Sequence, residues 1–181
     1  MEVPLWSPDG ATIAVGVDSA LQLRIIRVSD GEILRTIEKV LGFDLTPGGK
    51  DILIASTDGL LSATSIASGS SRSIANWKEI GSSFAGLKGS PDGKWIALIG
   101  MYDKGKTVQT HIYLINVANG NFTEVAKDDP GNKAYPIWSP DSKWITYCHI
   151  MAPLSDGSKK IRLEGTLWEA DLTDFMKKME R

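Results

Sequence analysis

The chain has 181 residues, of which 42% are hydrophobic and 23% are charged, as in an ordinary folded globular protein. Lysine and arginine together number 20 against 22 aspartates and glutamates, so a net charge of -2 argues against a nucleic-acid-binding surface. No apolar run approaches the roughly 20 residues that a membrane-spanning helix needs. The N-terminal stretch "MEVPLWSPDG" lacks the basic start and apolar segment of a signal peptide, and the single cysteine, Cys148, excludes an internal disulfide.

A turn motif recurs along the chain. Its copies are Ser7-Pro8-Asp9-Gly10, Thr46-Pro47-Gly48-Gly49, Ser90-Pro91-Asp92-Gly93 and Ser139-Pro140-Asp141-Ser142, with prolines 39, 44 and 49 residues apart. Proline presets the first φ of a tight turn, aspartate hydrogen-bonds nearby backbone, and glycine adopts the positive φ that closes it. We therefore expect Asp9, Asp92 and Asp141 to hold turns rather than to bind a metal or take part in a reaction.

Short apolar runs with the composition of strands surround each turn. The runs before the turns are "VPLW", "LGFDL", "FAGLKG" and "AYPIW", and those after them are "ATIAVGV", "DILIAS", "KWIALIG" and "KWITYCHI". Further runs follow in each copy, among them "LQLRIIRV", "LLSATSIA", "HIYLINVA" and "TLWEADL". β-Branched and aromatic residues dominate these runs, which predicts strands. Only the C-terminal "DLTDFMKKMER" predicts a helix, of one or two turns.

A period of about 44 residues with about four short strands is typical of a β-propeller blade. The stretches "WSPDG", "SPDGKWIALIG", "AYPIWSPDSKWITY" and "HIYLINVANG" resemble the TolB-like propeller repeat, which is related to the WD type. This resemblance spans essentially the whole chain, although Leu45 and Gly89 replace the expected aromatic residue and Gly48 replaces the aspartate. We predict an all-β single domain of about four TolB-like blades with four antiparallel strands each, at 1–39, 40–83, 84–133 and 134–181, the last incomplete.

Tryptophans flank the turns and are expected to fill the layers between blades; they are Trp6, Trp138, Trp95 and Trp144. The strand count leaves a ring unfinished, because the first copy starts at its inner strand and the last ends after its third. Three explanations are open: a fragment of a larger propeller, which we favour, two chains that associate into one ring, or a small four-bladed ring or open arc.

Motifs of catalysis and cofactor binding are missing from the sequence. It has no G-x-S-x-G elbow, phosphate-binding loop, dinucleotide fingerprint, H-E-x-x-H, C-x-x-C or EF-hand spacing. In "CHIM", residues 148–151, strand alternation places Cys148 opposite His149 and Met151, which makes an incomplete metal site. We expect no catalytic residue, no metal and no cofactor.

The connection between the second and third strands lengthens along the chain. It is "VDSA" and "STDG" in the first two copies, but "MYDKGKTVQT" and "MAPLSDGSKKIRLEG" in the last two, and the inter-blade segment "AKDDPGNKAY" shares their face. Long polar loops on a rigid scaffold usually carry binding function. The candidate binding residues of this loop face are Tyr102, Asp103, Lys104, Lys106, Asp128, Asp129, Asn132, Tyr135, Lys159, Lys160 and Arg162. The alternative is that they are solvated loop residues that bind nothing.

The resemblance implies a non-catalytic scaffold that binds a protein or peptide through the loop face. The alternative is an accessory propeller of a larger hydrolase, such as a prolyl-oligopeptidase-type serine peptidase, whose catalytic domain lies outside this sequence. A lyase or carbohydrate-binding propeller that uses Tyr102 and Tyr135 is the least favoured interpretation. TolB-like repeats imply a periplasmic location, whereas a complete chain without a signal peptide would be cytoplasmic. We expect a protein or peptide partner, with self-association or additional blades closing the ring, and no nucleic acid or membrane span.

Overall fold

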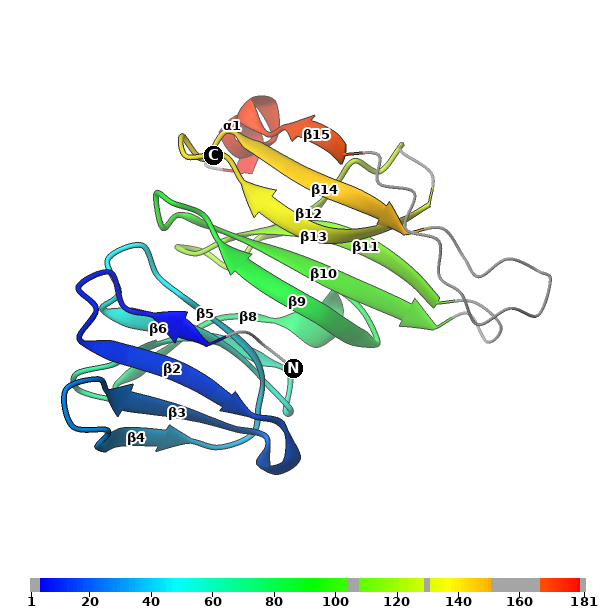
Figure 1. Ribbon diagram of the computed structural model, residues 1–181. Helices are drawn as coiled ribbons and strands as arrows, with labels where there is room; N and C mark the ends of the chain where they lie inside the picture. Colours follow the sequence, from blue (N-terminus) through cyan, green and yellow to red (C-terminus); the bar gives the residue numbers. More distant parts are fainter. Residues whose placement is uncertain (1–3, 104–107, 129–130, 151–166, 180–181) are drawn as a thin grey trace. The chain divides into compact units, whose positions relative to one another are not determined.

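The computed structural model describes residues 4–103, 108–128, 131–150 and 167–179, and antiparallel sheets dominate it (Figure 1). The chain divides into two compact units, Met1–Trp77 and Lys78–Arg181. Each unit contains two sheets. Within the described residues no helix is both long and apolar enough to cross a membrane.

The N-terminal unit holds the first sheet, in the order β1-β2-β3-β4, and the second sheet, in the order β5-β6-β7-β8. The strands of the first sheet are β1 (Leu5–Trp6), β2 (Thr12–Val17), β3 (Gln22–Arg27) and β4 (Ile33–Ile37), with a 3-10 turn η1 (Asp18–Ala20) between β2 and β3. Those of the second are β5 (Val40–Leu45), β6 (Asp51–Ser56), β7 (Leu60–Ser65) and β8 (Ser71–Asn76).

The C-terminal unit holds the third sheet, β9 to β12 in sequential order, and a fourth sheet with the order β13-β14-β15 among the described residues. A 3-10 turn, η2 (Trp77–Glu79), precedes the third sheet, whose strands are β9 (Ser83–Gly89), β10 (Trp95–Asp103), β11 (Val108–Asn116) and β12 (Phe122–Val125). The fourth sheet comprises β13 (Asn132–Trp138), β14 (Trp144–Ile150) and β15 (Leu167–Asp171), and α1 (Thr173–Met179) follows it. The all-β class and the short C-terminal helix predicted from the sequence are confirmed.

The Ser-Pro-Asp turns join the first two strands of three sheets, and all three use the same hydrogen bonds. In the third sheet the Ser90 hydroxyl donates to Asp92 Oδ1 at 2.6 Å and accepts from the Trp95 N–H at 3.0 Å, while Asp92 Oδ1 also accepts from the Lys94 N–H. Ser7 with Asp9 and Ser139 with Asp141 repeat this pattern. The three aspartates therefore hold turns, as predicted.

The second sheet keeps the hydroxyl but not the carboxylate. Thr46 Oγ1 donates to the Asp51 carbonyl at 2.9 Å and accepts from the Asp51 N–H at 3.2 Å. The threonine hydroxyl thus replaces the serine hydroxyl, and Gly49, at φ 63°, closes the turn without an aspartate.

Each unit has its own hydrophobic core between its two sheets. In the N-terminal unit the first sheet contributes Ala14, Leu23 and Ile25, which pack against Phe43, Ile52 and Ile54 of the second sheet. Leu23 and Ile52 are fully buried. Alternate residues of β2 and β3 therefore define one face of the first sheet, which packs on the second.

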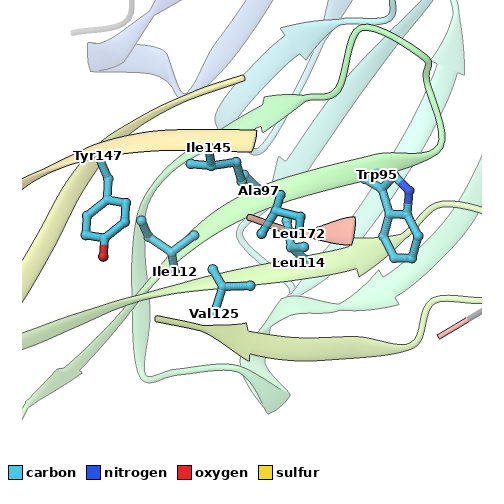
Figure 2. Close-up of a cluster of buried hydrophobic side chains, with 8 residues drawn as sticks. All are labelled: Trp95, Ala97, Ile112, Leu114, Val125, Ile145, Tyr147 and Leu172. Carbon is cyan, nitrogen blue, oxygen red and sulfur yellow. The ribbon is translucent and has the colours of Figure 1, made fainter. Parts of the chain in front are cut away.

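The core of the C-terminal unit is built in the same way (Figure 2). Trp95, Ala97 and Leu114 of the third sheet pack against Ile145 and Tyr147 of the fourth. Leu172, which precedes α1, is fully buried in this cluster. The helix packs against the same cluster through Met176 and Met179.

The four turn-flanking tryptophans do not share one environment. Trp95 is 1% exposed, and Trp138 is partly buried against the core of its unit, as predicted. The prediction is wrong for Trp6 and Trp144, which are 58% and 40% exposed. The physical reason is that both lie on sheet faces opposite to those that form the two cores.

Candidate functional site

The β10–β11 hairpin extends further than its counterparts in the first two sheets. Both strands are 9 residues long, whereas β2, β3, β6 and β7 have 6 residues each. Continuous pairing from Trp95↔Asn116 to Asp103↔Val108 keeps the whole hairpin in register. Because of this extra length, Tyr102 lies at the end of the C-terminal unit where the sequence predicts the loop face.

Two tyrosine hydroxyls meet on this hairpin. Tyr102 Oη lies 2.8 Å from Tyr113 Oη, and the Tyr102 hydroxyl also donates to the backbone carbonyl of Ile80. A phenol has a single proton to donate. Because the Tyr102 proton goes to Ile80, Tyr113 must donate to Tyr102, and the two hydroxyls form a directed chain that ends on the backbone.

A histidine and a glutamate continue this polar group on the same sheet face. His111 Nδ1 lies 2.6 Å from Glu124 Oε1, with 29% and 19% of the two side chains exposed. The Tyr102 ring contacts the His111 ring edge-on at a centroid distance of 5.5 Å. We call Tyr102, His111, Tyr113 and Glu124 the tyrosine–histidine cluster.

The environment of Tyr113 favours its neutral form. Burial raises the pKa of the Tyr113 hydroxyl well above its ordinary value, and the hydrogen bond with Tyr102 and the charge of Glu124 act in the same direction. Tyr113 therefore remains a hydrogen-bond donor at physiological pH and is not a candidate general base.

Asn132 connects the third and fourth sheets at the same end of the unit. Its Oδ1 accepts a hydrogen bond of 3.0 Å from the backbone N–H of Thr110, at the start of β11. Thr110 Oγ1 is buried there and has no hydrogen-bond partner among the residues that the structure describes. Asn132 thus has a structural role beside the hairpin, whatever else it binds.

Tyr135 presents an aromatic ring from the inner strand of the fourth sheet. It is 64% exposed and has a φ of 54°, at a register shift of β13 between Ala134 and Ile137. A positive φ is unfavourable for a bulky residue and often marks a functional position. Asp128, in the segment before β13, is exposed as well.

The structure thus places only part of the predicted loop face. Tyr102 and Asn132 lie at the same end of the C-terminal unit, Tyr135 lies three residues along β13 from Asn132, and Asp103 ends β10. The predicted residues Lys104, Lys106, Asp129, Lys159, Lys160 and Arg162 lie outside the described residues. Asn132 differs from the expectation of a solvated loop residue, because it begins a strand and accepts a backbone hydrogen bond.

Sequence reasoning missed His111, Tyr113 and Glu124 as partners of Tyr102. Part of the cluster was predictable from the sequence, because His111 and Tyr113 are two residues apart on one strand and must share a face. Their pairing with Glu124 and with Tyr102 required the register of three strands.

The predicted "CHIM" stretch shows the alternation expected of β14. His149 lies beside Tyr147, with ring centroids 6.0 Å apart, while Met151 lies outside the described residues. Within the part of the chain that the structure describes, no three His, Cys, Asp or Glu residues are grouped as a metal site would require.

Comparisons with known proteins place the fold. No family model matches the chain. It is 29% identical over 164 residues to the uncharacterized peptidase YuxL of Bacillus subtilis, a match that covers 86% of this chain and 23% of that protein. The chain therefore spans about a quarter of the length of this curated relative.

Solved structures give a broader likeness at low identity. A Kuenenia stuttgartiensis hydrazine synthase matches 93% of this chain and 53% of its own, with a TM-score of 0.64 and 16% identity. The β-propeller domain of Myceliophteria thermophila Cps50 (Swd1) matches 92% of this chain and 52% of its own, with a TM-score of 0.63 and 14% identity. The tricorn protease matches 88% of this chain and 16% of its own, with a TM-score of 0.59 and 16% identity.

These likenesses and the repeated antiparallel sheets define the class: the chain has a β-propeller fold. Within that class, the sequence similarity is to a segment of a peptidase-named protein.

Proposed function

We propose that this chain is a TolB-like propeller module that binds an extended peptide or a protein segment at the loop end of its C-terminal unit. The observation that carries the proposal is the exposed Tyr135 ring, on the strand β13 that begins with Asn132 beside the long β10–β11 hairpin. Ordered aromatic side chains provide contact area at a low cost in conformational entropy. Asp128 adds an exposed carboxylate near β13.

The hydrogen bonds of the tyrosine–histidine cluster suit a binding surface better than a catalytic site. Tyr113 is kept neutral and donates to Tyr102, while His111 is engaged by Glu124. Such a network fixes side chains in one geometry, which is what a binding surface needs. The proposed ligand contacts are the Tyr135 ring and neighbouring loop groups.

A second candidate function is supported by the YuxL match. In this alternative the module is the accessory propeller of a serine peptidase and controls which peptides reach a catalytic domain outside this sequence. Both functions bind peptide at the propeller. They differ in the size of ligand, because an access-restricting propeller favours short peptides whereas a scaffold binds long or folded partners.

The test is a peptide-array screen followed by titration of the strongest peptides by calorimetry. We expect binding in the micromolar range, and Tyr135→Ala should weaken it about tenfold, with a melting temperature close to that of the wild type because the ring is mostly exposed. Leu60→Ala, a 41% exposed apolar residue of the N-terminal unit, is the control and should leave binding unchanged.

Ligand length separates the two functions. Affinity that falls steeply as the peptide is extended into a long chain favours the peptidase-associated module, and undiminished affinity favours the scaffold. Failure of every peptide to bind, or equal loss in Tyr135→Ala and Leu60→Ala, would refute peptide binding at this end.

A further inference from the structure

The turn between β11 and β12 carries the dipeptide Asn119-Gly120, the sole Asn-Gly step in the sequence. Asn119 is exposed, and its Oδ1 accepts a hydrogen bond of 2.9 Å from the Asn121 N–H. Gly120 follows at a φ of 75°, the left-handed conformation that glycine adopts readily. The side-chain amide of Asn119 is therefore held over the peptide bond that joins it to Gly120.

Two other sheets build the same turn with a different oxygen. In the first sheet Asp30 Oδ1 accepts from the Glu32 N–H at 3.0 Å, and in the second sheet Ser68 Oγ accepts from the Ser70 N–H at 3.2 Å. A glycine of positive φ follows Asp30 and Ser68, as it follows the asparagine of the third sheet. The turn thus needs an oxygen acceptor at this position, and a carboxylate supplies it as an amide does.

An asparagine followed by glycine is chemically labile, because glycine has no side chain to hinder attack by its own backbone nitrogen. The Gly120 nitrogen forms a bond to Asn119 Cγ and gives up its proton, and the side-chain nitrogen leaves as ammonia, which produces a five-membered cyclic imide. Water then opens the imide. Cleavage between Cγ and the Gly120 nitrogen gives aspartate, whereas cleavage between the Asn119 carbonyl carbon and the same nitrogen gives isoaspartate.

We propose that Asn119 is a site of spontaneous deamidation, which converts this turn into the aspartate turn that the first sheet already contains. The exposed side chain, its position over the Gly120 nitrogen, and the aspartate tolerated at Asp30 together support this assignment. The net reaction consumes one water and releases one ammonia. A carboxyl group is ionised at neutral pH, so the product carries one more negative charge than the net charge of -2 of the unmodified chain.

One hydrogen bond of the turn opposes the reaction. The Gly120 N–H donates to the Asn116 carbonyl at 2.8 Å, and this bond must open before the nitrogen attacks. We therefore expect the folded chain to deamidate more slowly than the urea-unfolded chain. Asn119 should still react before the other four asparagines, which precede tryptophan, valine, phenylalanine or lysine.

This turn lies at the opposite end of the strands from the proposed peptide site. The Val117 N–H donates to the Lys94 carbonyl, next to the Ser90 turn, whereas Tyr102 lies at the other end of β10. Deamidation should therefore leave peptide binding unchanged, and the inference does not depend on the proposed function.

The test follows the wild-type chain at body temperature and mildly alkaline pH by peptide mass spectrometry over several weeks. We expect the peptide that contains Asn119 to gain about 1 Da, because OH replaces NH2, and one ammonia to be released for each chain modified. Asn121 is the internal control, since it is also exposed and lies in the same turn. It should remain unmodified because the side chain of Phe122 hinders attack.

Two substitutions complete the experiment. Asn119→Ser copies the Ser68 turn, so it should keep the fold and abolish the change in mass. Asn119→Asp should elute with the aspartate product in ion-exchange chromatography. Its melting temperature should lie within about 1 °C of the wild-type value, because the position is exposed.

The proposal would be overturned by any of three results. Asn119 that stays intact in the folded chain, while the urea-unfolded chain deamidates, would show that the turn protects it. Conversion of Asn121 at the same rate would show that the turn gives Asn119 no special reactivity. A change in mass that persists in Asn119→Ser would place the modification at another residue.

Discussion

At the scale of single residues, one serine hydroxyl organises each Ser-Pro-Asp turn. The Ser90 hydroxyl donates to Asp92 and accepts from the Trp95 N–H, and Ser90 is fully buried. A buried N–H that loses its acceptor costs the full desolvation of that group. The turn is therefore a stability element whose strength depends on burial.

Ser90→Ala should lower the free energy of unfolding by about 1–3 kcal/mol, because it leaves the Trp95 N–H without its acceptor. Ser139→Ala is the matched control, since Ser139 makes the same two hydrogen bonds in a more exposed turn where water replaces them. Ser139→Ala should therefore lower the free energy of unfolding by less than about 1 kcal/mol. Chemical denaturation measures both, and equal costs would contradict the role of burial.

The turn aspartates also predict a pH dependence of stability. Hydrogen bonds from the Ser139 hydroxyl and then from the Lys143 N–H lower the pKa of Asp141, and the Ser7 hydroxyl and the Ala11 N–H likewise lower that of Asp9. A carboxyl whose pKa is lower in the folded state stabilises the fold above the unfolded pKa, which is about 4 for aspartate. This stabilisation is lost as the pH falls through the folded pKa.

We therefore expect the melting temperature to fall between about pH 4 and pH 2, and to fall less in Asp141→Asn, whose side chain does not titrate. Asp174→Asn, in the first turn of α1, removes the same charge outside the turns and is the control. A pH profile of Asp141→Asn that is identical to the wild-type profile would show that this turn contributes nothing to acid stability.

At the scale of elements, the turns also connect neighbouring sheets. In the C-terminal unit the Asp92 N–H donates to Ser142 Oγ at 3.0 Å, so the third-sheet turn touches the fourth-sheet turn. In the N-terminal unit Gly49 occupies the Ser142 position, and a Cβ there would lie 2.3 Å from Pro8 Cδ of the first-sheet turn. Glycine is needed at this position for space as well as for its φ.

Gly49→Ala should therefore destabilise the N-terminal unit more than Gly10→Ala. Both positions have a positive φ, 63° and 69°, which costs alanine about 1–2 kcal/mol. Only Gly49→Ala also creates a clash with Pro8, which should lower the free energy of unfolding by about a further 1–3 kcal/mol. A Cβ at Gly10 would meet nothing within 4 Å. Chemical denaturation of the two variants measures the difference in their free energies of unfolding. An equal loss in both would mean that the first-sheet and second-sheet turns move apart without cost when the Cβ is added.

At the scale of the whole molecule, the two units have separate cores. Leu23 is fully buried in the N-terminal core and Leu114 in the C-terminal core. In repeat architectures each sheet contacts only its neighbours, so stability is approximately a sum of local contributions. A core substitution should then act mainly within its own unit.

Leu23→Ala should cost about 2–5 kcal/mol and speed amide hydrogen exchange mainly in residues 4–77. Leu114→Ala, at an equally buried position, should speed it mainly in the described residues beyond 77. Exchange followed by peptide mass spectrometry measures both. Uniform acceleration over both units in either variant would indicate a single cooperative core.

Local patterns predicted most of the secondary structure, because strand composition and the Ser-Pro-Asp turns are properties of short segments. The turn role of Asp92 and the C-terminal helix at Thr173–Met179 followed from such patterns. Within the candidate site, strand alternation alone places His111 and Tyr113 on one face. Their link to Tyr102 and Glu124 did not follow, because it depends on how three strands pair.

The sequence by itself determined a repeated, all-β chain, since its turn chemistry and apolar alternation act over a few residues at a time. Only the tertiary structure decided which tryptophans are buried. Trp95 and Trp144 occupy the same repeat position, yet the first is covered and the second is 40% exposed. Burial depends on whether another sheet lies against that face, and no local pattern contains this information.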